Sequence, residues 1–243
     1  MEHRRIIKLG TIVFATHEDG SMDPDGPFSM GLFDADTRFL SRFQIYLNGI
    51  EPRLLGSTEE SPFQAGFLHT NTELSNVPAR SIGVLQRNSI KGDTASILLG
   101  ITNCTSQPVE FELSVDIGAD FFDSFEARGV KRQKRGTLAE PIAKGDTLEL
   151  GYVGLDNIKR TTTIKCEPAF ASYKNDRLQF PISIEGNTFT TVTFKVECAE
   201  HAEGGSQRCM APRARGRSSR TGSTRARRSK SATVWCRPFW NGA

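Results

Sequence analysis

The sequence predicts an all-β protein whose main part is a large antiparallel β-sandwich. Short segments that alternate apolar and polar residues recur along residues 1–199, and turn-forming dipeptides such as Asn48-Gly49 separate them. No segment of this part shows the apolar period of a long amphipathic helix. Frequent short strands with turn signals between them are typical of sandwiches, in which two sheets bury their apolar faces against each other.

The first expected strand covers residues 8–15 and runs toward the turn signal Asp19-Gly20. A cluster of Asp, Pro and Gly at 23–27 predicts a structural turn. Residues 32–40 are compatible with a helical turn, and residues 120–125 with either a helical turn or an extended segment. Strict alternation at 43–47 predicts a half-buried strand that ends at Asn48-Gly49, where both residues tolerate positive φ.

The remaining expected strands show the same alternation or carry β-branched residues. They cover residues 63–70, 82–90, 95–104, 109–117, 148–155, 161–166, 177–183 and 189–198. The clearest of them is 109–117, because its apolar residues all fall on one face and its polar residues on the other.

The charge of the chain is divided between two parts. Residues 200–243 hold nine Arg and one Lys against two Glu, a net charge of +8, whereas residues 1–199 carry a net charge of −5. The basic part has almost nothing to bury, so we expect a β-sandwich domain over 1–199 and a disordered Arg-rich tail over 200–243. We attribute the abrupt change in composition to a frameshift; the alternative is a selected arm that binds nucleic acid through its phosphates.

Cysteine usage and hydropathy bear on the compartment. The five Cys include no CxxC pair, which argues against a zinc site or a disulfide framework, and we expect Cys104, Cys166 and Cys198 to be mostly buried thiols. The N-terminus lacks an apolar run of signal-peptide length, and no window approaches the ~18 apolar residues of a membrane span. We therefore expect a cytoplasmic protein without a membrane partner.

Two segments combine clustered polar side chains with apolar anchors. The candidate site residues in them are Asp34, Asp36, Thr37, Arg38, Asp120, Asp123, Glu126 and Arg128. Phe33 and Phe39 should anchor the first segment while its polar side chains face outward; structural ion pairs are the competing interpretation. The basic stretch at 131–136 lacks interleaved aromatic residues, so we interpret it as a solvated hairpin edge and not as a nucleic-acid site.

The quoted segments also carry a family resemblance. GLFDADTRFLSR, LNG, ITNCTSQPVEFELSVDIGADFFDSFEARG and KRQKRG, within roughly residues 8–198, resemble the N-terminal domain of bacterial glycogen-debranching (amylo-α-1,6-glucosidase-like) enzymes. The resemblance implies a supersandwich-like β-domain that is followed, in the family, by a helical (α/α)6 barrel with the catalytic carboxylates. Nothing after residue 198 resembles that barrel.

The expected function is therefore a non-catalytic one. The chain should be the N-terminal β-sandwich of a debranching-type glycoside hydrolase, truncated before its barrel, with no catalytic residue, metal or cofactor of its own. Its partners should be the barrel and, indirectly, an α-glucan, and the candidate residues should lie at the substrate rim or the domain interface. The alternative is a stand-alone carbohydrate- or protein-binding sandwich. A stand-alone carbohydrate binder should present aromatic platforms, but residues 1–199 hold no Trp and only three Tyr: Tyr46, Tyr152 and Tyr173. This composition weighs against the alternative.

Overall fold

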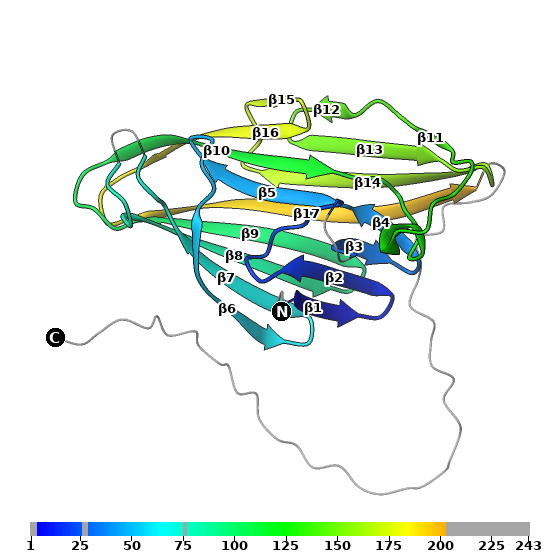
Figure 1. Cartoon of the computed structure of the whole chain (residues 1–243). Helices are drawn as coiled ribbons and strands as arrows, with labels where there is room; N and C mark the ends of the chain where they lie inside the picture. Colours follow the sequence, from blue (N-terminus) through cyan, green and yellow to red (C-terminus); the bar gives the residue numbers. More distant parts are fainter. Residues whose placement is uncertain (1–3, 26–28, 75–76, 203–243) are drawn as a thin grey trace, which may run out of the picture. The chain divides into compact units, whose positions relative to one another are not determined.

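The computed structural model describes residues 4–25, 29–74 and 77–202. In these ranges the strands form three antiparallel sheets, and the single helix is the short 3-10 turn η1 (Glu126–Arg128) (Figure 1). The predicted all-β class with large antiparallel sheets is confirmed. No helix in the described part of the chain is long and apolar enough to cross a membrane.

The largest sheet has nine strands. Its order is β11 (Thr137–Leu138), β13 (Thr147–Val153), β14 (Ile158–Glu167), β17 (Phe189–Ala202), β9 (Thr94–Asn103), β8 (Ile82–Lys91), β7 (Gln64–Thr70) and β6 (Arg53–Ser61), with β12 (Ile142–Lys144) paired to β13. Each expected strand of this sheet is present within a few residues of its predicted bounds. Strand β17 extends past the expected domain boundary at 199, and the expected tail over 203–243 lies outside the described residues.

A second sheet packs on the first and encloses the core. Its order is β15 (Ser172–Lys174), β16 (Arg177–Ile184), β10 (Val109–Gly118) and β5 (Arg42–Leu47). Phe43 of β5 and Phe180 of β16 both contact Phe194 of β17 edge to face, with ring centroids 5.4 and 5.7 Å apart. The alternation predicted for 109–117 is confirmed, because the apolar residues of β10 are all buried.

The N-terminal sheet has the order β1 (Arg4–Leu9), β2 (Ile12–His17), β3 (Gly31–Asp34) and β4 (Thr37–Leu40). The turn after β2 rests on the nine-stranded sheet, where His69 Nε2 lies 2.9 Å from the Asp19 carbonyl oxygen. Gln86 Nε2 donates to the Gly20 carbonyl oxygen at 2.9 Å. Thr162 Oγ1 of β14 donates to the Phe39 carbonyl oxygen at 2.6 Å, which ties β4 to the same large sheet.

Two sequence-based expectations for the N-terminal region are wrong. Residues 8–15 are not one strand, because Gly10 adopts φ +62° and turns the chain between β1 and β2. Residues 32–40 contain no helical turn; they form the hairpin of β3 and β4, with Ala35 at φ +50° in its turn. In both places a tight turn interrupts an apolar run that is too short to reveal its period.

The three cysteines of the described part differ in exposure. Cys166 is buried and Cys198 is half-buried, but Cys104 is exposed, contrary to the expectation of buried thiols. Burial raises the pKa of the Cys166 thiol to about 12.

Candidate functional site at one end of the sandwich

Three connections meet at one end of the sandwich. They are the β3–β4 turn, the long segment between β10 and β11, and the turn between β13 and β14. The Arg38 N–H donates to the Phe122 carbonyl oxygen at 2.8 Å, and Thr37 pairs with Asp123 in an isolated β-bridge. The Gly136 N–H donates to the Tyr152 hydroxyl at 2.8 Å. The structure thus brings together the two polar segments that the sequence singled out.

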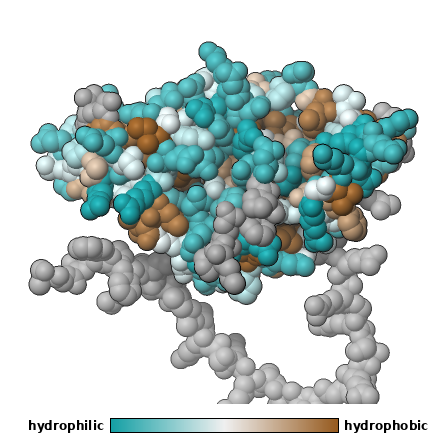
Figure 2. Space-filling model, viewed as in Figure 1, coloured by the Kyte–Doolittle hydropathy of each residue, from teal (hydrophilic) through white to brown (hydrophobic). Residues whose placement is uncertain are grey.

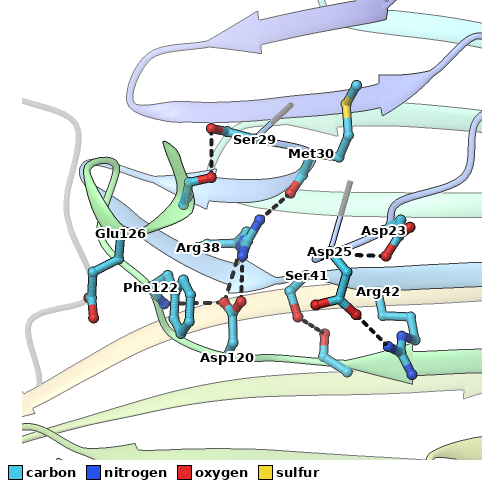
Figure 3. A network of polar contacts seen from close by, with 12 residues as sticks. Asp23, Asp25, Ser29, Met30, Arg38, Ser41, Arg42, Asp120, Phe122 and Glu126 are labelled. Carbon is cyan, nitrogen blue, oxygen red and sulfur yellow. Dashed lines mark hydrogen bonds and ion pairs between the residues drawn. The ribbon is translucent and has the colours of Figure 1, made fainter. Parts of the chain in front are cut away.

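Arg38 lies at the centre of this assembly and is only 1% exposed. Its Nε donates to Asp120 Oδ1 at 3.0 Å, its Nη2 to Asp120 Oδ2 at 2.5 Å, and its Nη1 to the Met30 carbonyl oxygen at 2.9 Å (Figure 3). The expectation that this side chain faces outward is therefore wrong. Arg38 is buried because a carboxylate from the other polar segment and a main-chain carbonyl satisfy its donors.

Gly31 makes room for the buried arginine. It has φ +143°, and a Cβ at this position would lie 2.6 Å from Arg38 Cδ and 2.5 Å from the Leu40 carbonyl oxygen. The ladder between β3 and β4 shifts register next to Gly31, between Leu32 and Phe33. The absence of a Cβ at Gly31 thus leaves space for the Arg38 side chain, which bonds to Asp120.

Phe122 and Arg135 extend the network. Asp120 Oδ1 accepts from the Phe122 N–H at 3.2 Å, and Arg135 Nη2 donates to the Asp120 carbonyl oxygen at 2.7 Å. The Phe122 ring has the Arg135 guanidinium 4.2 Å from its centroid and that of Arg38 at 5.4 Å. Two cations therefore contact one aromatic ring, an arrangement that the ring quadrupole stabilises.

Asp123 and Glu126 hold the start of η1. Asp123 Oδ1 accepts from the N–H groups of Phe125 and Glu126 at 2.9 and 2.8 Å, and Glu126 Oε2 accepts in return from the Asp123 N–H at 3.2 Å. The mutual bonds resemble a capping box. Residues 120–125 thus contain no helical turn, because η1 begins after them; they are not extended throughout either, since Asp123 forms a β-bridge but Phe121 has φ +53°.

The basic stretch at 131–136 supplies partners to these carboxylates. Arg132 bonds to Asp123 and lies 3.5 Å from Glu126 Oε2, while Arg135 Nε lies 3.0 Å from Glu126 Oε1. The interpretation of this stretch as a solvated hairpin edge is wrong for Arg135, which is half-buried, whereas Arg132 pairs with carboxylates but remains exposed. Lys131 and Lys134 are exposed, in keeping with that interpretation.

The other candidate residues lie at the edge of the assembly. Asp34 Oδ1 accepts from Thr11 Oγ1 at 2.7 Å, and burial together with the Asp34 charge raises the pKa of the Cys198 thiol. Asp36 and Arg128 are exposed, and neither side chain bonds to another described residue. These two are free to meet a partner or a ligand.

A hollow of about 230 Å³ opens between the three connections. Its walls include Thr37, Asp123, Glu126, Arg132, Arg135, Tyr152, Leu155, Asp156 and Arg160. Tyr152, Asp156 and Arg160 were not predicted as site residues from the sequence. The alternation of apolar and polar residues in two paired strands does not show which end of the pair lies next to a distant loop. In the described residues, no group of three or more acidic, His or Cys side chains is placed to hold a metal ion.

The hollow lies beside the end of the last described strand. Ala202 pairs with Ile158, and Arg160 Nε lies 2.9 Å from Glu200 Oε1 and its Nη2 3.0 Å from Asp156 Oδ2. The C-terminal end of β17 therefore lies next to the candidate residues.

A sequence-family comparison covers nearly all of the described part of the chain. The model of a family described as the N-terminal domain of (some) glycogen debranching enzymes matches residues 7–195, a range that contains all eight candidate residues. No curated protein sequence matches this chain significantly.

Comparisons with solved structures give matches at low sequence identity, and one of them has a TM-score above 0.5. The Slr1438 protein from Synechocystis sp. PCC 6803 superposes with a TM-score of 0.51 at 9% identity, over 82% of this chain and 96% of its own. A protein titled as an aldose 1-epimerase from Escherichia coli K12 gives 0.48 at 10% identity, over 82% and 99% of the two chains. A protein titled as a kojibiose phosphorylase from the human microbiome gives 0.49 at 11% identity over 82% of this chain, which spans only 28% of the phosphorylase.

Proposed function

Because the chain belongs to the family of N-terminal domains of glycogen debranching enzymes, we propose that it acts as a non-catalytic domain that supports an (α/α)6 catalytic barrel. In the intact enzyme it would also shape one wall of the α-glucan site, in the cytoplasm. The chain alone would then have no glycosidase activity. We expect the partner domain to be an (α/α)6 barrel because the segments around Arg38 and Asp120 resemble a family in which such a barrel follows this domain.

One observation carries this proposal: the candidate residues lie beside the C-terminal end of β17, the last described strand. Near the C-terminal end of β17, Ala199 pairs with Thr161 of β14, next to Arg160, which borders the hollow. A domain on the C-terminal side would begin next to the three converging connections. Loops on a rigid sheet framework are suited to such a role, since the framework sets their position while their tips remain free for contact.

The carboxylates at this end have structural partners, which supports a non-catalytic role. Glycoside hydrolysis needs two carboxyl groups that flank the scissile bond, one of which must donate a proton. Asp120 is bonded to Arg38, and Asp123 and Glu126 are each paired with Arg132 and accept main-chain N–H bonds at or just before the start of η1. We assign these acids to the construction of the rim, and we assign contact with the partner to the exposed Asp36 and Arg128.

For the organisation of the chain, we propose a sandwich domain over residues 1–199 and a frameshift-derived segment over residues 200–243. The family match ends at residue 195, close to the change in composition. Reading the genomic DNA downstream of codon 198 in all three frames tests this directly. A barrel-coding continuation in another frame is the expected result; a stop codon in every frame would contradict the frameshift.

The proposed function is tested by pairing this chain with a barrel. We suggest fusing residues 1–202 to the C-terminal part of an intact family member whose own N-terminal domain has been removed. The fusion should release sugar from glycogen and short maltosyl substrates, whereas the 243-residue chain alone and the bare barrel should release little or none. Hydrolysis by the chain alone, or full activity of the bare barrel, would refute the proposal.

A further inference from the structure

Part of the nine-stranded sheet has an apolar outer surface. The core residues of β7, β8 and β9 alternate with residues that point away from the core. A sheet with one face in water normally carries polar residues at such positions. Here the outward residues include large apolar ones, which we call the apolar face: Leu68, Leu85, Leu98 and Phe189. Leu68 is 45% exposed and Phe189 is 73% exposed, while Leu85 and Leu98 are half-buried.

Other outer surfaces of the domain are polar. In the same sheet, Lys195 of β17 lies opposite Lys165 of β14. Thr163 of β14 lies between Glu197 of β17 and Glu149 of β13. Figure 2 shows the side of the molecule on which the N-terminal sheet lies, and hydrophilic residues predominate there. The apolar face is therefore a local property of β7 to β9 and of the beginning of β17.

The residues of the apolar face are contiguous. Leu68 lies opposite Leu85 in the ladder, and Leu85 lies opposite Gly100. A Cβ at Gly100 would lie 4.0 Å from both Leu85 Cβ and Leu98 Cδ2. Phe189 lies in the adjoining row, two residues before the β17 partner of Gly100. Contiguous exposed apolar residues mark interaction sites, whereas single exposed leucines are common on protein surfaces.

Three glycines lie among these residues although the chain itself does not require them. Gly56, Gly83 and Gly100 occupy outward positions of β6, β8 and β9, and none has the positive φ that favours glycine. A Cβ at Gly56 would meet no atom within 4 Å, and the nearest atoms to a Cβ at Gly83 or Gly100 would lie at 4.0 and 3.8 Å, an ordinary contact distance. Glycine weakens a strand, and inside a strand it often marks a place where another backbone approaches closely.

The charges beside the apolar face are already paired within the chain. Arg87 lies opposite Leu98, and its Nη2 is 3.3 Å from Glu60 Oε1. Contact with another molecule would therefore leave no isolated charge at this place, which would be costly. An apolar centre with paired polar groups at its border is the usual arrangement of a protein–protein interface.

The position of the apolar face indicates which partner covers it. Phe189 is the first residue of the 14-residue strand β17, and Ala202, at the other end, lies about 40 Å away. A catalytic domain that docks where the three connections meet, as proposed above, therefore leaves the apolar face open. Most homo-oligomers form two-fold symmetric contacts in which both copies use the same surface. We propose that the apolar face packs against the apolar face of a second copy of this chain.

The size of the surface is sufficient for such a dimer. Neighbouring strands of a sheet lie ~4.8 Å apart, and the seven residues of β7 span ~24 Å. The outward surface of the five strands β6, β7, β8, β9 and β17 is thus about 24 by 24 Å, or roughly 600 Å² per copy. Two copies would bury roughly 1,200 Å², the lower end of the range for specific interfaces, so the dissociation constant should be micromolar.

Sedimentation velocity of the 243-residue chain at about 1 to 500 μM tests the proposal and should show a monomer–dimer equilibrium. Leu68→Glu should raise the dissociation constant by about tenfold or more, because it places a charge in the contact. The matched control is Val153→Glu, since Val153 is 43% exposed in the same sheet but lies outside the apolar face. This control should dimerise like the unmodified chain.

A second variant separates loss of the contact from loss of the fold. Gly100→Gln adds a side chain at the centre of the apolar face, where the chain itself has room for a Cβ. It should weaken the dimer by about tenfold or more without lowering the melting temperature of the monomer. Thr163→Gln, at an outward position of β14, is its control and should leave the dimer unchanged.

Several outcomes would overturn the dimer. They are a chain that stays monomeric up to about 500 μM, and a dimer that the folded Leu68→Glu and Gly100→Gln variants leave unchanged. Association that disappears in about 0.5 M NaCl would instead reflect attraction between the basic residues 200–243 and the acidic residues 1–199.

The barrel fusion distinguishes the second copy from the catalytic domain. If Leu68→Glu, but not Val153→Glu, abolishes the activity of a monomeric fusion, the catalytic domain covers the apolar face and the dimer is refuted. A fusion that stays monomeric but hydrolyses glycogen would refute the dimer and leave the proposed function intact.

Discussion

The guanidinium of Arg38 forms two parallel hydrogen bonds with the carboxylate of Asp120, which lies 82 residues further along the chain. Arg38 is 1% exposed, and its third bond, to the Met30 carbonyl oxygen, fastens the segment before β3 to the same point. The pair thus joins the N-terminal sheet to the long connection after β10. Around it the two candidate segments take up their positions at the loop end.

Replacing Arg38 by Ala should destabilise the domain strongly. The change leaves the half-buried Asp120 carboxylate and the Met30 carbonyl without their donor, and breaking such a pair costs about 3 kcal/mol or more. Urea unfolding followed by fluorescence or circular dichroism measures the loss. The control Arg128→Ala changes an exposed arginine of the same segment and should cost less than about 0.5 kcal/mol. Equal, small effects of the two variants would show that the Arg38–Asp120 pair does not support the fold.

Gly31→Ala should also lower the stability of the domain, in this case by straining the backbone. The new Cβ would lie 2.5 Å from the Leu40 carbonyl oxygen at φ +143°, so strain and a steric clash act together, at about 2 kcal/mol or more. Gly49→Ala is the matched control, because Gly49 also has a positive φ, of +77°, but faces open space. It should cost about 1 kcal/mol. If the Gly31 variant is no less stable than the Gly49 variant, the close packing at Gly31 is not a constraint.

The outcome at Arg38 illustrates what the sequence could and could not predict. Period-two alternation in 109–117 was enough to predict β10, because neighbouring residues alone show which face of a strand is apolar and will be buried. The direction of the Arg38 side chain depends on Asp120, which no local pattern connects to it. The turn at Gly10 was missed for a different reason: one glycine inside a short apolar run is compatible with a strand or with a turn. Likewise, Tyr152 and Arg160 belong to the hollow only through strand pairing at long range.

Stability should also fall in mild acid because of His69. Burial lowers the pKa of this side chain, although its hydrogen bond to the Asp19 carbonyl opposes the shift. The unfolded chain, with a His pKa of about 6.5, then binds a proton at a higher pH than the folded chain does. The His69 contribution is therefore complete above pH ~6.5 and is lost as the pH falls toward the folded-state pKa, with a slope of at most about 1.4 kcal/mol per pH unit.

Unfolding free energies of the unmodified chain and of His69→Gln between pH 5 and pH 8 test this reasoning. Glutamine retains an N–H donor for the Asp19 carbonyl but does not titrate, so the variant should lose part of the pH dependence. His17→Gln is the control, since His17 is only half-buried. Identical pH profiles for the unmodified chain and the His69 variant would contradict the prediction.

The apolar side chains at the loop end should matter only when a partner domain is present. Phe125 and Leu155 are 64% and 66% exposed, so Phe125→Ser and Leu155→Ser should change the stability of the chain alone by no more than about 0.5 kcal/mol. In the fusion with a catalytic barrel they should lower activity or the cooperativity of unfolding, because an interface leaves apolar side chains buried. Phe189→Ser is the matched control: Phe189 is 73% exposed, but it begins β17, whose other end lies beside the hollow. If Phe189→Ser impairs the fusion as much as Leu155→Ser does, the loop end is not the docking surface.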